Sequence, residues 1–420
     1  MRREIQMRIC IIGGGPSGLM CALKAAENPK HRVFVIEKNE KAGKKIYITG
    51  KGRCNVTNCC SEREFIENVV TNAKFLYSAI HRFSSEDAMS FFEENGVRLV
   101  VERGNRVFPA SYRASDITKA LLKRCEMNGV RFFYREKAEK IEKTGGVFSV
   151  ETDRTSYIAD AVVIASGGKS YPLTGSTGDG YRFARAFGLE VVSPVPALVP
   201  LKIKGILPEK AREITLKNVN LKAIVKETGK ILTEEFGELL LEKNALGGPI
   251  ALTISSRINR EKKTSLALEL DFKPSLDEET LKKRIQRDID AMKKRKNATV
   301  FYLLRGLIPE GLIDLIARDS ALDTRSEISS VEEEHISRLI RTLKHYRWDF
   351  DGTESFDRAI ITSGGISVGE IRPRTMESKD ISGLYFVGET LDVDAYTGGF
   401  NMQIALSTGY CAGTDLREKS

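Results

Sequence analysis

The sequence of 420 residues has few of the features that mark secreted, membrane or metal-binding proteins. Its seven cysteines are an odd, scattered set without a Cys-x-x-Cys pair, which argues against a disulfide framework and a structural zinc site. No run approaches the roughly 18 apolar residues that a membrane-spanning helix needs. The basic start resembles a signal peptide, but its apolar stretch ends after Ile12 in a glycine turn. We therefore expect a cytoplasmic protein without a membrane span or a metal site.

Histidine, tryptophan and proline are also scarce, with four, one and 12 residues. The histidines lie outside every glycine-rich motif, so a histidyl link to a cofactor is not expected; they are His31, His81, His335 and His345. With 41% hydrophobic and 29% charged residues, the composition is that of an ordinary globular chain. The length predicts two or three domains, at roughly 100–200 residues each. The formal charge of +9 suits an anionic substrate, a dinucleotide or RNA, and does not choose between them.

Short β-branched runs alternate with helical patterns over residues 8–188, which is typical of an α/β sheet wound with helices. The predicted strands are 8–12, 32–37, 130–134, 146–150 and 161–165, and the helical patterns are 17–26, 62–94, 114–128 and 179–188. Strand patterns return at 359–362 and 384–387, before a last helix at 399–412. We therefore expect one nucleotide-binding domain built from both ends of the chain.

The segment between these two parts has a different pattern, and it begins with Pro194, Pro196 and Pro200. Short alternating runs at 221–225 and 265–270 predict an antiparallel sheet or a small barrel. After these runs, apolar residues recur at helical spacing from Leu281 onward, which predicts helices. The predicted domains are a nucleotide-binding domain at 1–192 and 356–420, an inserted β-rich subdomain at 193–275 and 326–355, and a helical subdomain at 276–325.

The helical pattern around 282–296 is strongly basic on one side and apolar on the other. Its cations are Lys282, Lys283, Arg284, Arg287, Lys293, Lys294, Arg295 and Lys296, and its apolar stripe is Leu281, Ile285, Ile289 and Met292. Such a run is usually a solvated face over a packed stripe, and the alternative is a face that binds RNA or another anion.

Gly13, Gly15 and Gly18 form a Gly-x-Gly-x-x-Gly motif directly after a predicted strand and before a predicted helix. The first glycine allows a tight turn, the second lets the backbone approach a pyrophosphate, and the third lets helix and strand pack closely. Glu37 ends the next strand, where a carboxylate can accept hydrogen bonds from both ribose hydroxyls. This arrangement predicts dinucleotide binding.

Three later segments favour FAD over NAD(P). The buried strand 160–168 ends in small residues, and the strand 383–389 ends in an acidic residue that can hold ribityl hydroxyls, which NAD lacks. Residues 397–403 open the last helix, whose N–H groups and positive dipole end could face a flavin. Each segment alone could be an ordinary turn beside a buried strand. The residues expected at the cofactor here are Ala165, Ser166, Gly167, Gly388, Glu389, Asp392, Gly398, Gly399, Asn401 and Met402.

Several longer motifs carry a family resemblance over nearly the whole chain. They are IIGGGPSGL (11–19), GKKIYITGKGRCNVTN (43–58), SGGKSYPLTGSTGDGY (166–181), PALVPL (196–201), TSGGISVGEI (362–371) and the closing stretch 375–413. The chain resembles the BaiN-type NAD(P)/FAD-dependent oxidoreductases, also described as aminoacetone oxidase family FAD-binding enzymes, within the glutathione reductase and fumarate reductase superfamily of flavoproteins. The resemblance implies an α/β fold: a Rossmann-type FAD domain interrupted by a β-barrel-like and a helical subdomain. One departure is ALGGP at 245–249, where the family more often has Leu-Ser-Gly-Pro.

The family pattern also places a loop along the pyrophosphate and toward the flavin. It contains Lys44, Arg53, Cys54 and Asn55, and the cofactor contacts implied nearby are Pro16, Ser17 and Lys38. A cationic pair beside two phosphates makes electrostatic sense. The alternatives are a solvated loop for Lys44 and Arg53, and a small packed thiol for Cys54.

Two motifs suggest other chemistry. Cys54 and Cys59 are spaced like the redox pair of disulfide reductases, but that interpretation predicts a second Gly-x-Gly-x-x-Gly motif, which the sequence lacks. Gly168-Lys-Ser170 imitates the end of a P-loop, but Val163 stands where the first glycine is needed. We therefore do not expect a disulfide reductase, a kinase or an ATPase.

The sequence thus predicts an oxidoreductase that transfers hydride through non-covalent FAD. The donor would be NAD(P)H, docking transiently, or an organic molecule, and the acceptor a small organic substrate such as an activated alkene or a carbonyl. Nucleic acid is not the expected partner. No residue stands out as the catalytic acid or base, and the direction and oligomeric state stay open. The alternatives are a flavin-dependent tRNA-modifying enzyme, supported only by the basic helix at 282–296, and a flavin-binding sensor without turnover.

Overall fold

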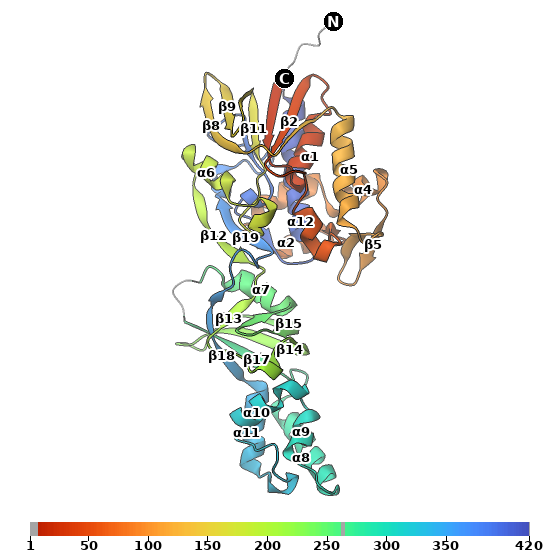
Figure 1. The fold of residues 1–420 in the computed structure, drawn as a ribbon, viewed down its shortest axis with the longest axis vertical. Coiled ribbons are helices and arrows are strands. Elements are labelled where there is room, and N and C mark those ends of the chain that lie inside the picture. Colours follow the sequence, from red (N-terminus) through yellow and green to blue (C-terminus); the bar gives the residue numbers. More distant parts are fainter. Residues whose placement is uncertain (1–6, 262–264, 420) are drawn as a thin grey trace. The chain divides into compact units, whose positions relative to one another are not determined.

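The computed structural model in Figure 1 describes residues 7–261 and 265–419. Residues 1–6, 262–264 and 420 belong to the predicted domain ranges but lie outside the described residues. The chain forms two compact units. The first combines the residues up to Pro196 with those from Phe356, and the second is Ala197–Ser355. The finer division of the inserted segment at 275/276 and 325/326 stays a prediction.

The first unit is built on a five-stranded parallel sheet with the order β20-β11-β1-β2-β7. The strands are β1 (Met7–Ile12), β2 (His31–Glu37), β7 (Arg131–Tyr134), β11 (Ala161–Ile164) and β20 (Leu384–Phe386). The last four residues of β1 and all of β11 are buried, as expected for a sheet covered on both faces. Strand β1 has β2 on one side and β11 on the other, which makes it the topological switch point of the sheet.

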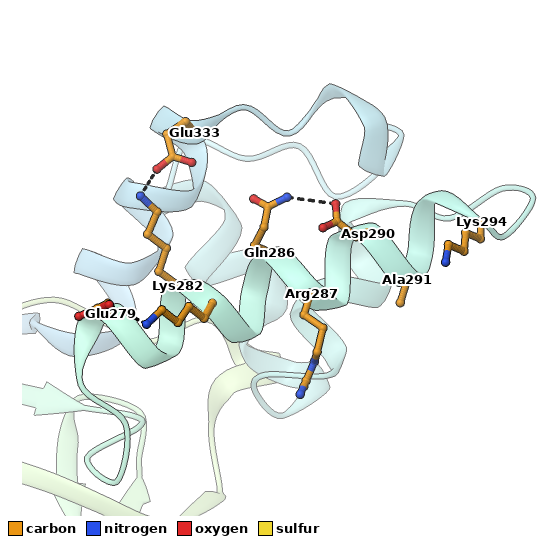
Figure 2. Close-up of a pocket in the computed structure, with 9 residues that line it drawn as sticks. Glu279, Lys282, Gln286, Arg287, Asp290, Ala291, Lys294 and Glu333 are labelled. Carbon is orange, nitrogen blue, oxygen red and sulfur yellow. Dashed lines mark hydrogen bonds and ion pairs between the residues drawn. The ribbon is translucent and has the colours of Figure 1, made fainter.

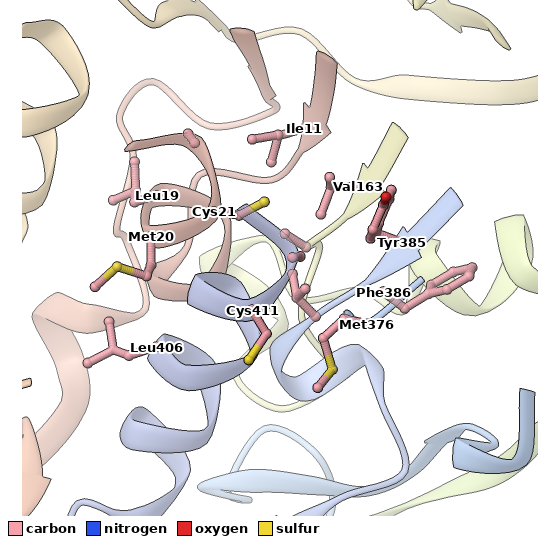
Figure 3. Close-up of a cluster of buried hydrophobic side chains, with 14 of the residues drawn as sticks. Ile11, Leu19, Met20, Cys21, Val163, Met376, Tyr385, Phe386, Leu406 and Cys411 are labelled. Atoms are coloured by element: carbon pink, nitrogen blue, oxygen red, sulfur yellow. The ribbon is translucent and has the colours of Figure 1, made fainter. Parts of the chain in front are cut away.

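Helices from both ends of the chain share one core in this unit. They are α1 (Pro16–Ala25), α5 (Ala114–Met127) and α12 (Phe400–Glu418). Helix α12 lies so close to α1 that a Cβ on Gly409 or Gly413 would come within 2.3 or 2.5 Å of the carbonyl oxygen of Ser17 or Cys21. Figure 3 shows buried side chains of α1, α12 and the sheet in one cluster. The C-terminal segment is therefore part of the N-terminal core.

Smaller elements complete the first unit. One antiparallel sheet contains β8 (Ala138–Thr144), β9 (Val147–Thr152) and β10 (Ser156–Ala159), and another contains β3 (Thr57–Asn58), β5 (Leu99–Glu102) and β6 (Arg106–Pro109). Two strand pairs join distant segments: β12 (Val191–Ala197) with β19 (Ile361–Ile366), and β4 (Val69–Thr71) with β21 (Asp394–Ala395). Helix α6 (Asp179–Ala186) follows β11.

The helical pattern at 62–94 corresponds to three helices rather than to helix throughout. They are α2 (Glu62–Glu67), α3 (Ala73–Arg82) and α4 (Ser85–Glu94), with strand β4 between the first two. Ser61 and Ser84 each begin a helix with a capping box, so that the side chain satisfies a free backbone N–H group. The local caps divide a stretch whose apolar periodicity alone looks continuous.

The second unit contains a closed barrel and a group of helices. The barrel order is β13 (Leu201–Ile203), β16 (Ala245–Gly247), β15 (Ile231–Leu241), β14 (Ile214–Val225), β17 (Leu266–Asp271) and β18 (Tyr346–Thr353). The helices are α7 (Pro249–Ile258), α8 (Glu278–Lys293), α9 (Val300–Arg305), α10 (Ile313–Asp319) and α11 (Glu333–Lys344). The predicted fold class, a Rossmann-type α/β domain with inserted barrel and helices, is confirmed. Among the described residues, no helix has the length and apolar character to cross a bilayer.

Candidate functional site

The carboxyl ends of the parallel strands bring several loops to one edge of the sheet. The loops after β1 and β2 are joined by a hydrogen bond from the Gly14 N–H to Glu37 Oε2 at 2.7 Å. The loops after β1 and β11 are in contact, since a Cβ on Gly13 would lie 2.5 Å from the Ala165 carbonyl oxygen. Ligands of open α/β sheets bind outside such strand ends, at the switch point. We call this edge the strand-end site.

In the glycine loop of the strand-end site, Gly18 is tightly packed and Gly15 faces open space. A Cβ on Gly18 would lie 2.0 Å from the carbonyl oxygen of Gly13, whereas a Cβ on Gly15 would meet no heavy atom within 4 Å. Packing therefore requires glycine at 18 but not at 15. Helix α1 starts at Pro16 without a side-chain cap or an acidic residue in its first turn. Its free N–H groups and positive dipole end are available to an anion.

The buried Glu37 carboxylate accepts three hydrogen bonds. Oε2 accepts the Gly14 N–H at 2.7 Å, and Oε1 accepts the backbone N–H and the side-chain amide of Asn39 at 2.8 and 2.7 Å. A carboxylate has about four acceptor positions, so about one is left. Glu37 thus fixes the loop geometry and keeps capacity for a hydroxyl group of a ligand.

The predicted cationic residues each have a partner within the protein. Lys38 Nζ lies 2.6 Å from both Thr177 Oγ1 and Asp179 Oδ2. Lys44 Nζ lies 3.4 Å from Glu40 Oε2 and from Asn39 Oδ1. These contacts anchor the two lysines on neighbouring loops, and their contact with a cofactor stays a prediction.

Arg53 also has partners of its own. Its Nη1 lies 3.3 Å from Glu102 Oε1, and its guanidinium lies 4.6 Å from the centre of the Phe108 ring. This places Arg53 against the small sheet of β3, β5 and β6. Its predicted place beside a pyrophosphate stays a prediction.

The two cysteines of the proposed redox spacing lie in different environments. Cys54 is buried, and burial raises the pKa of its thiol to about 12, while Cys59 is exposed. At neutral pH the Cys54 thiolate is therefore scarce, and a thiolate is what thiol–disulfide exchange requires. The alternative that Cys54 is a packed thiol fits this environment.

Two predicted cofactor residues have buried polar atoms without a hydrogen-bond partner in the described part of the chain. They are Asn55 Oδ1 and Ser166 Oγ. Ser166 lies between Ala165, which contacts Gly13, and Gly167, which has a φ of 73°. A buried polar atom without a partner is costly unless a ligand or water satisfies it. Both atoms can therefore form a hydrogen bond with a ligand or a water molecule at this edge.

A group of four polar residues surrounds the turn after β20, and we call it the Glu389 cluster: Lys45, Ser170, Thr362 and Glu389. Lys45 Nζ lies 2.5 Å from Glu389 Oε2 and 2.6 Å from Ser170 Oγ. Glu389 Oε1 accepts the Ser170 hydroxyl at 2.6 Å and the Thr362 N–H at 2.9 Å. The sequence pointed to Glu389 and missed the other three, because they come from segments far away in the chain, with Thr362 in strand β19. The signal for them was that all three belong to motifs of the family resemblance, at 43–58, 166–181 and 362–371.

Asp392 and Asn401 hold neighbouring loops together. Asp392 accepts the side-chain amide of Asn72 at Oδ2, at 3.1 Å, and at its backbone oxygen, at 2.7 Å. Asn401 Oδ1 accepts the Ala395 N–H at 3.0 Å, and its amide donates to the carbonyl oxygens of Ala395 and Tyr396 at 2.7 and 3.2 Å. The structure thus gives both side chains a positioning role, and their contact with a cofactor stays a prediction.

The start of α12 is shaped by two glycines. A Cβ on Gly399, whose φ is 101°, would lie 2.3 Å from the carbonyl oxygen of Thr57. The Gly398 carbonyl oxygen accepts the Asn58 amide at 3.0 Å, and Met402 is buried. Helix α12 has no side-chain cap and no acidic residue in its first turn. Its first N–H groups are available to negative charge, as at α1.

The basic helix α8 of the second unit lines a pocket in Figure 2. Several of its cations pair with nearby acids: Lys282 pairs with Glu333, and Lys283 Nζ lies 2.6 Å from Glu279 Oε1. The stripe of Leu281, Ile285 and Ile289 is buried. The helix therefore matches a solvated face over a packed stripe.

Comparison with known sequences gives matches along nearly the whole chain. The family model described as HI0933-like protein Rossmann domain matches residues 7–415. The chain is 31% identical over 415 residues to the 3-dehydro-bile acid delta(4,6)-reductase of Clostridium scindens (strain ATCC 35704 / DSM 5676 / VPI 13733 / 19), covering 98% of this chain and 99% of the relative. It is 30% identical over 407 residues to the ribosomal RNA dihydrouridine synthase of Escherichia coli (strain K12), covering 97% of each.

Comparison with solved structures supports the same fold. A flavocytochrome c3 fumarate reductase in its open conformation matches with a TM-score of 0.52 and 16% sequence identity. The match covers 98% of this chain and 78% of that chain. At this identity the likeness concerns the fold alone.

Proposed function

This chain belongs to the HI0933-like Rossmann-domain family, and from this membership we propose that it reduces a carbon–carbon double bond with FAD held at the strand-end site. It is an oxidoreductase of the flavoprotein class. When bound, FAD would supply the hydride chemistry that protein side chains lack. The observation that carries the proposal is the match to a double-bond reductase along 98% of the chain.

The residues of the strand-end site fit a dinucleotide. Open space above Gly15 leaves room for a pyrophosphate beside the N-terminus of α1. Glu37 keeps about one acceptor position for a ribose hydroxyl. Asn55 Oδ1 and Ser166 Oγ lack the polar partners that a cofactor would bring. These four features lie on separate loops and favour the same kind of ligand.

The protein's own groups would then bind and orient the cofactor. The first N–H groups of α12 would stabilise negative charge that develops during reduction, because they carry the positive end of the helix dipole. The Glu389 cluster would fix the turn after β20, and Asn401 would hold residues 395–396 in place.

The substrate class follows from the names of two relatives. Reduction of a bile acid double bond and formation of dihydrouridine both add hydrogen across a carbon–carbon double bond. In uracil this bond is conjugated with a carbonyl group, which makes it an acceptor for hydride. We propose an alkene of this activated kind as the substrate and NAD(P)H as a transient donor.

Non-covalent binding of FAD is supported by the four histidines, since each contacts a protein group away from the strand-end site. His31 contacts the carbonyl oxygen of Leu416, and His335 accepts the Glu332 N–H at 3.2 Å. His81 lies 3.4 Å from Glu62, and His345 lies 3.3 and 3.1 Å from Glu269 and Glu278.

Anaerobic visible spectroscopy of the purified protein tests the proposal. We expect a flavin band that bleaches with NADH or NADPH and returns when an activated alkene, such as a 3-oxo-4,6-diene steroid, is added. Denaturation should release the flavin into the filtrate. Absence of a flavin band after reconstitution with FAD would contradict the proposal.

The second test is a variant that fills the open space at Gly15. Its φ of −77° suits any residue, so Gly15→Val should fold like the wild type, yet its side chain would occupy the space assigned to the pyrophosphate. We expect FAD affinity to fall at least tenfold with an unchanged melting temperature of the apoprotein. Wild-type affinity in this variant would show that the cofactor does not use this loop.

A second candidate substrate is a uridine in RNA, as in the Escherichia coli relative. The observation that favours it is a pair of arginines beside one exposed aromatic ring, next to the small sheet. Arg53 lies 5.7 Å from the Tyr112 ring, which is 44% exposed, and Arg53 and Arg106 lie 4.6 and 5.9 Å from the buried Phe108 ring. Arginines and stacking aromatics are the usual means of binding single-stranded RNA. Salt-sensitive binding of a uridine-rich RNA would support this candidate, and its absence at low salt would remove it.

A further inference from the structure

The Glu389 cluster contains a pair of opposite charges that is mostly withdrawn from water. The side chains of Lys45 and Glu389 are 19% and 20% exposed. Their contact joins residues 344 positions apart, from the loop after β2 and the turn after β20. When one partner of such a pair is removed, the remaining charge loses its compensation in a poorly solvated place.

Each donor in the cluster restrains the Glu389 carboxylate, but only one of them carries a charge. The Ser170 hydroxyl and the Thr362 N–H donate to Oε1, and Lys45 donates to Oε2. Ser170 is itself buried and accepts a hydrogen bond from Lys45. Lys45 therefore contributes two things at once, since it fixes the carboxylate and makes the pair electrically neutral.

We propose that Lys45 is a positioning residue of the cofactor site that acts through Glu389. Its charge keeps the Lys45–Glu389 pair neutral, so that the site tolerates the negative charge that reduction adds to the cofactor. A Glu389 carboxylate without its lysine would oppose that negative charge by direct repulsion. The inference rests on the proposed function, because it requires FAD at the strand-end site.

The test compares the wild type with Lys45→Met, Lys45→Arg and the double variant Lys45→Met/Glu389→Gln. Lys41→Met is the control, because Lys41 is an exposed lysine of the same loop whose Nζ lies 4.3 Å from the centre of the Tyr47 ring. Two quantities are measured: the Kd for FAD, by fluorescence quenching on apoprotein, and the midpoint potential of the bound flavin, by anaerobic dye equilibration at saturating FAD.

In Lys45→Met we expect FAD to bind at least tenfold more weakly and the midpoint potential to fall. Lys45→Arg keeps the charge and should restore both quantities. The double variant removes both charges, so its potential should return toward the wild-type value even though FAD still binds weakly. Lys41→Met should stay within twofold of the wild-type Kd, with an unchanged potential.

Two results would overturn the proposal. One is a Lys45→Met protein with wild-type Kd and potential, and the other is a potential that falls equally in Lys45→Met and in the double variant, which would show a purely structural role. Circular dichroism checks that each variant folds, and if Lys45→Met does not fold, Lys45→Gln replaces it in every comparison. A wild-type protein that binds no FAD would instead refute the proposed function, so the two failures are distinguishable.

Discussion

The charged groups of helix α8 and those of the Glu389 cluster show two ways in which one chain uses opposite charges. On α8 the pairs are exposed, as in Lys283 with Glu279, four residues away, whose side chains are 74% and 77% exposed. In the Glu389 cluster the pair is mostly buried and its members are 344 residues apart. Exposed pairs contribute little to stability, whereas the loss of one partner from a mostly buried pair leaves an uncompensated charge in a poorly solvated place. The highest density of charged residues in the sequence therefore lies on α8, where the ion pairs contribute less to stability than the pair in the Glu389 cluster.

The largest expected effect of a single substitution comes from glycine packing at the strand-end site. Gly18→Ala would place a methyl group 2.0 Å from the backbone oxygen of Gly13, which cannot be relieved by a side-chain movement. We expect a loss of about 2–4 kcal/mol in the free energy of unfolding and no binding of FAD. Urea denaturation checks this. A variant as stable as the wild type would show that α1 can shift freely.

Removal of one acidic partner in each region tests the comparison directly. Glu389→Gln should cost about 1–3 kcal/mol, because Lys45 keeps its charge and loses its carboxylate. Glu333→Gln on α11 leaves Lys282 exposed to water and should cost about 0–0.5 kcal/mol. Equal losses in paired denaturation curves would remove the distinction between the two regions.

The pH dependence of stability provides a smaller effect. The hydrogen bond from Arg8 holds the pKa of Asp160 below its ordinary value, so this carboxylate stabilises the fold above its unfolded pKa. Stability is lost as the pH falls through the lowered pKa. The side chains of Arg8 and Asp160 are 38% and 30% exposed, so water screens their attraction. We therefore expect Asp160→Asn to lower the free energy of unfolding by no more than about 1 kcal/mol at pH 7.

Melting temperatures of the wild type and Asp160→Asn should converge as the pH falls below the ordinary pKa of an aspartate and through the lowered pKa of Asp160. The reason is that protonation of Asp160 removes in the wild type the charge that the variant already lacks. A constant gap between pH 7 and pH 3 would show that the variant loses packing rather than charge.

The smallest effect should come from α8 itself. Lys282→Ala removes one exposed ion pair with Glu333, and alanine favours helix, so the free energy of unfolding should change by less than about 0.5 kcal/mol. Thermal melts with and without 0.5 M salt check this. A larger, salt-dependent loss of stability would show that the exposed ion pair of Lys282 stabilises the fold, which would contradict this prediction.

Local patterns predicted much of the fold. The strands around 8–12, 32–37 and 161–165 and the glycine loop were predictable because hydrophobic period, turn chemistry and helix caps act between near neighbours. The strand β4 inside 62–94 was not, since it is defined by pairing with β21, more than three hundred residues later. The ion pairs of Lys38, Lys44 and Arg53 with Asp179, Glu40 and Glu102 were also not predicted, and the predicted contacts of these cations with a cofactor stay predictions.

The sequence by itself determined the class of the protein: the glycine loop, the acidic end of β2 and the closing motif indicated a Rossmann-type fold for a dinucleotide, because each depends on residues close together in the chain. Only the tertiary structure decided which charges meet. Lys45 and Lys44 are neighbours in one motif, yet Lys45 lies beside Glu389 and Lys44 beside Glu40. Parallel strands bring their carboxyl ends to one edge whatever their order in the chain, so contacts at that edge are a property of the folded sheet.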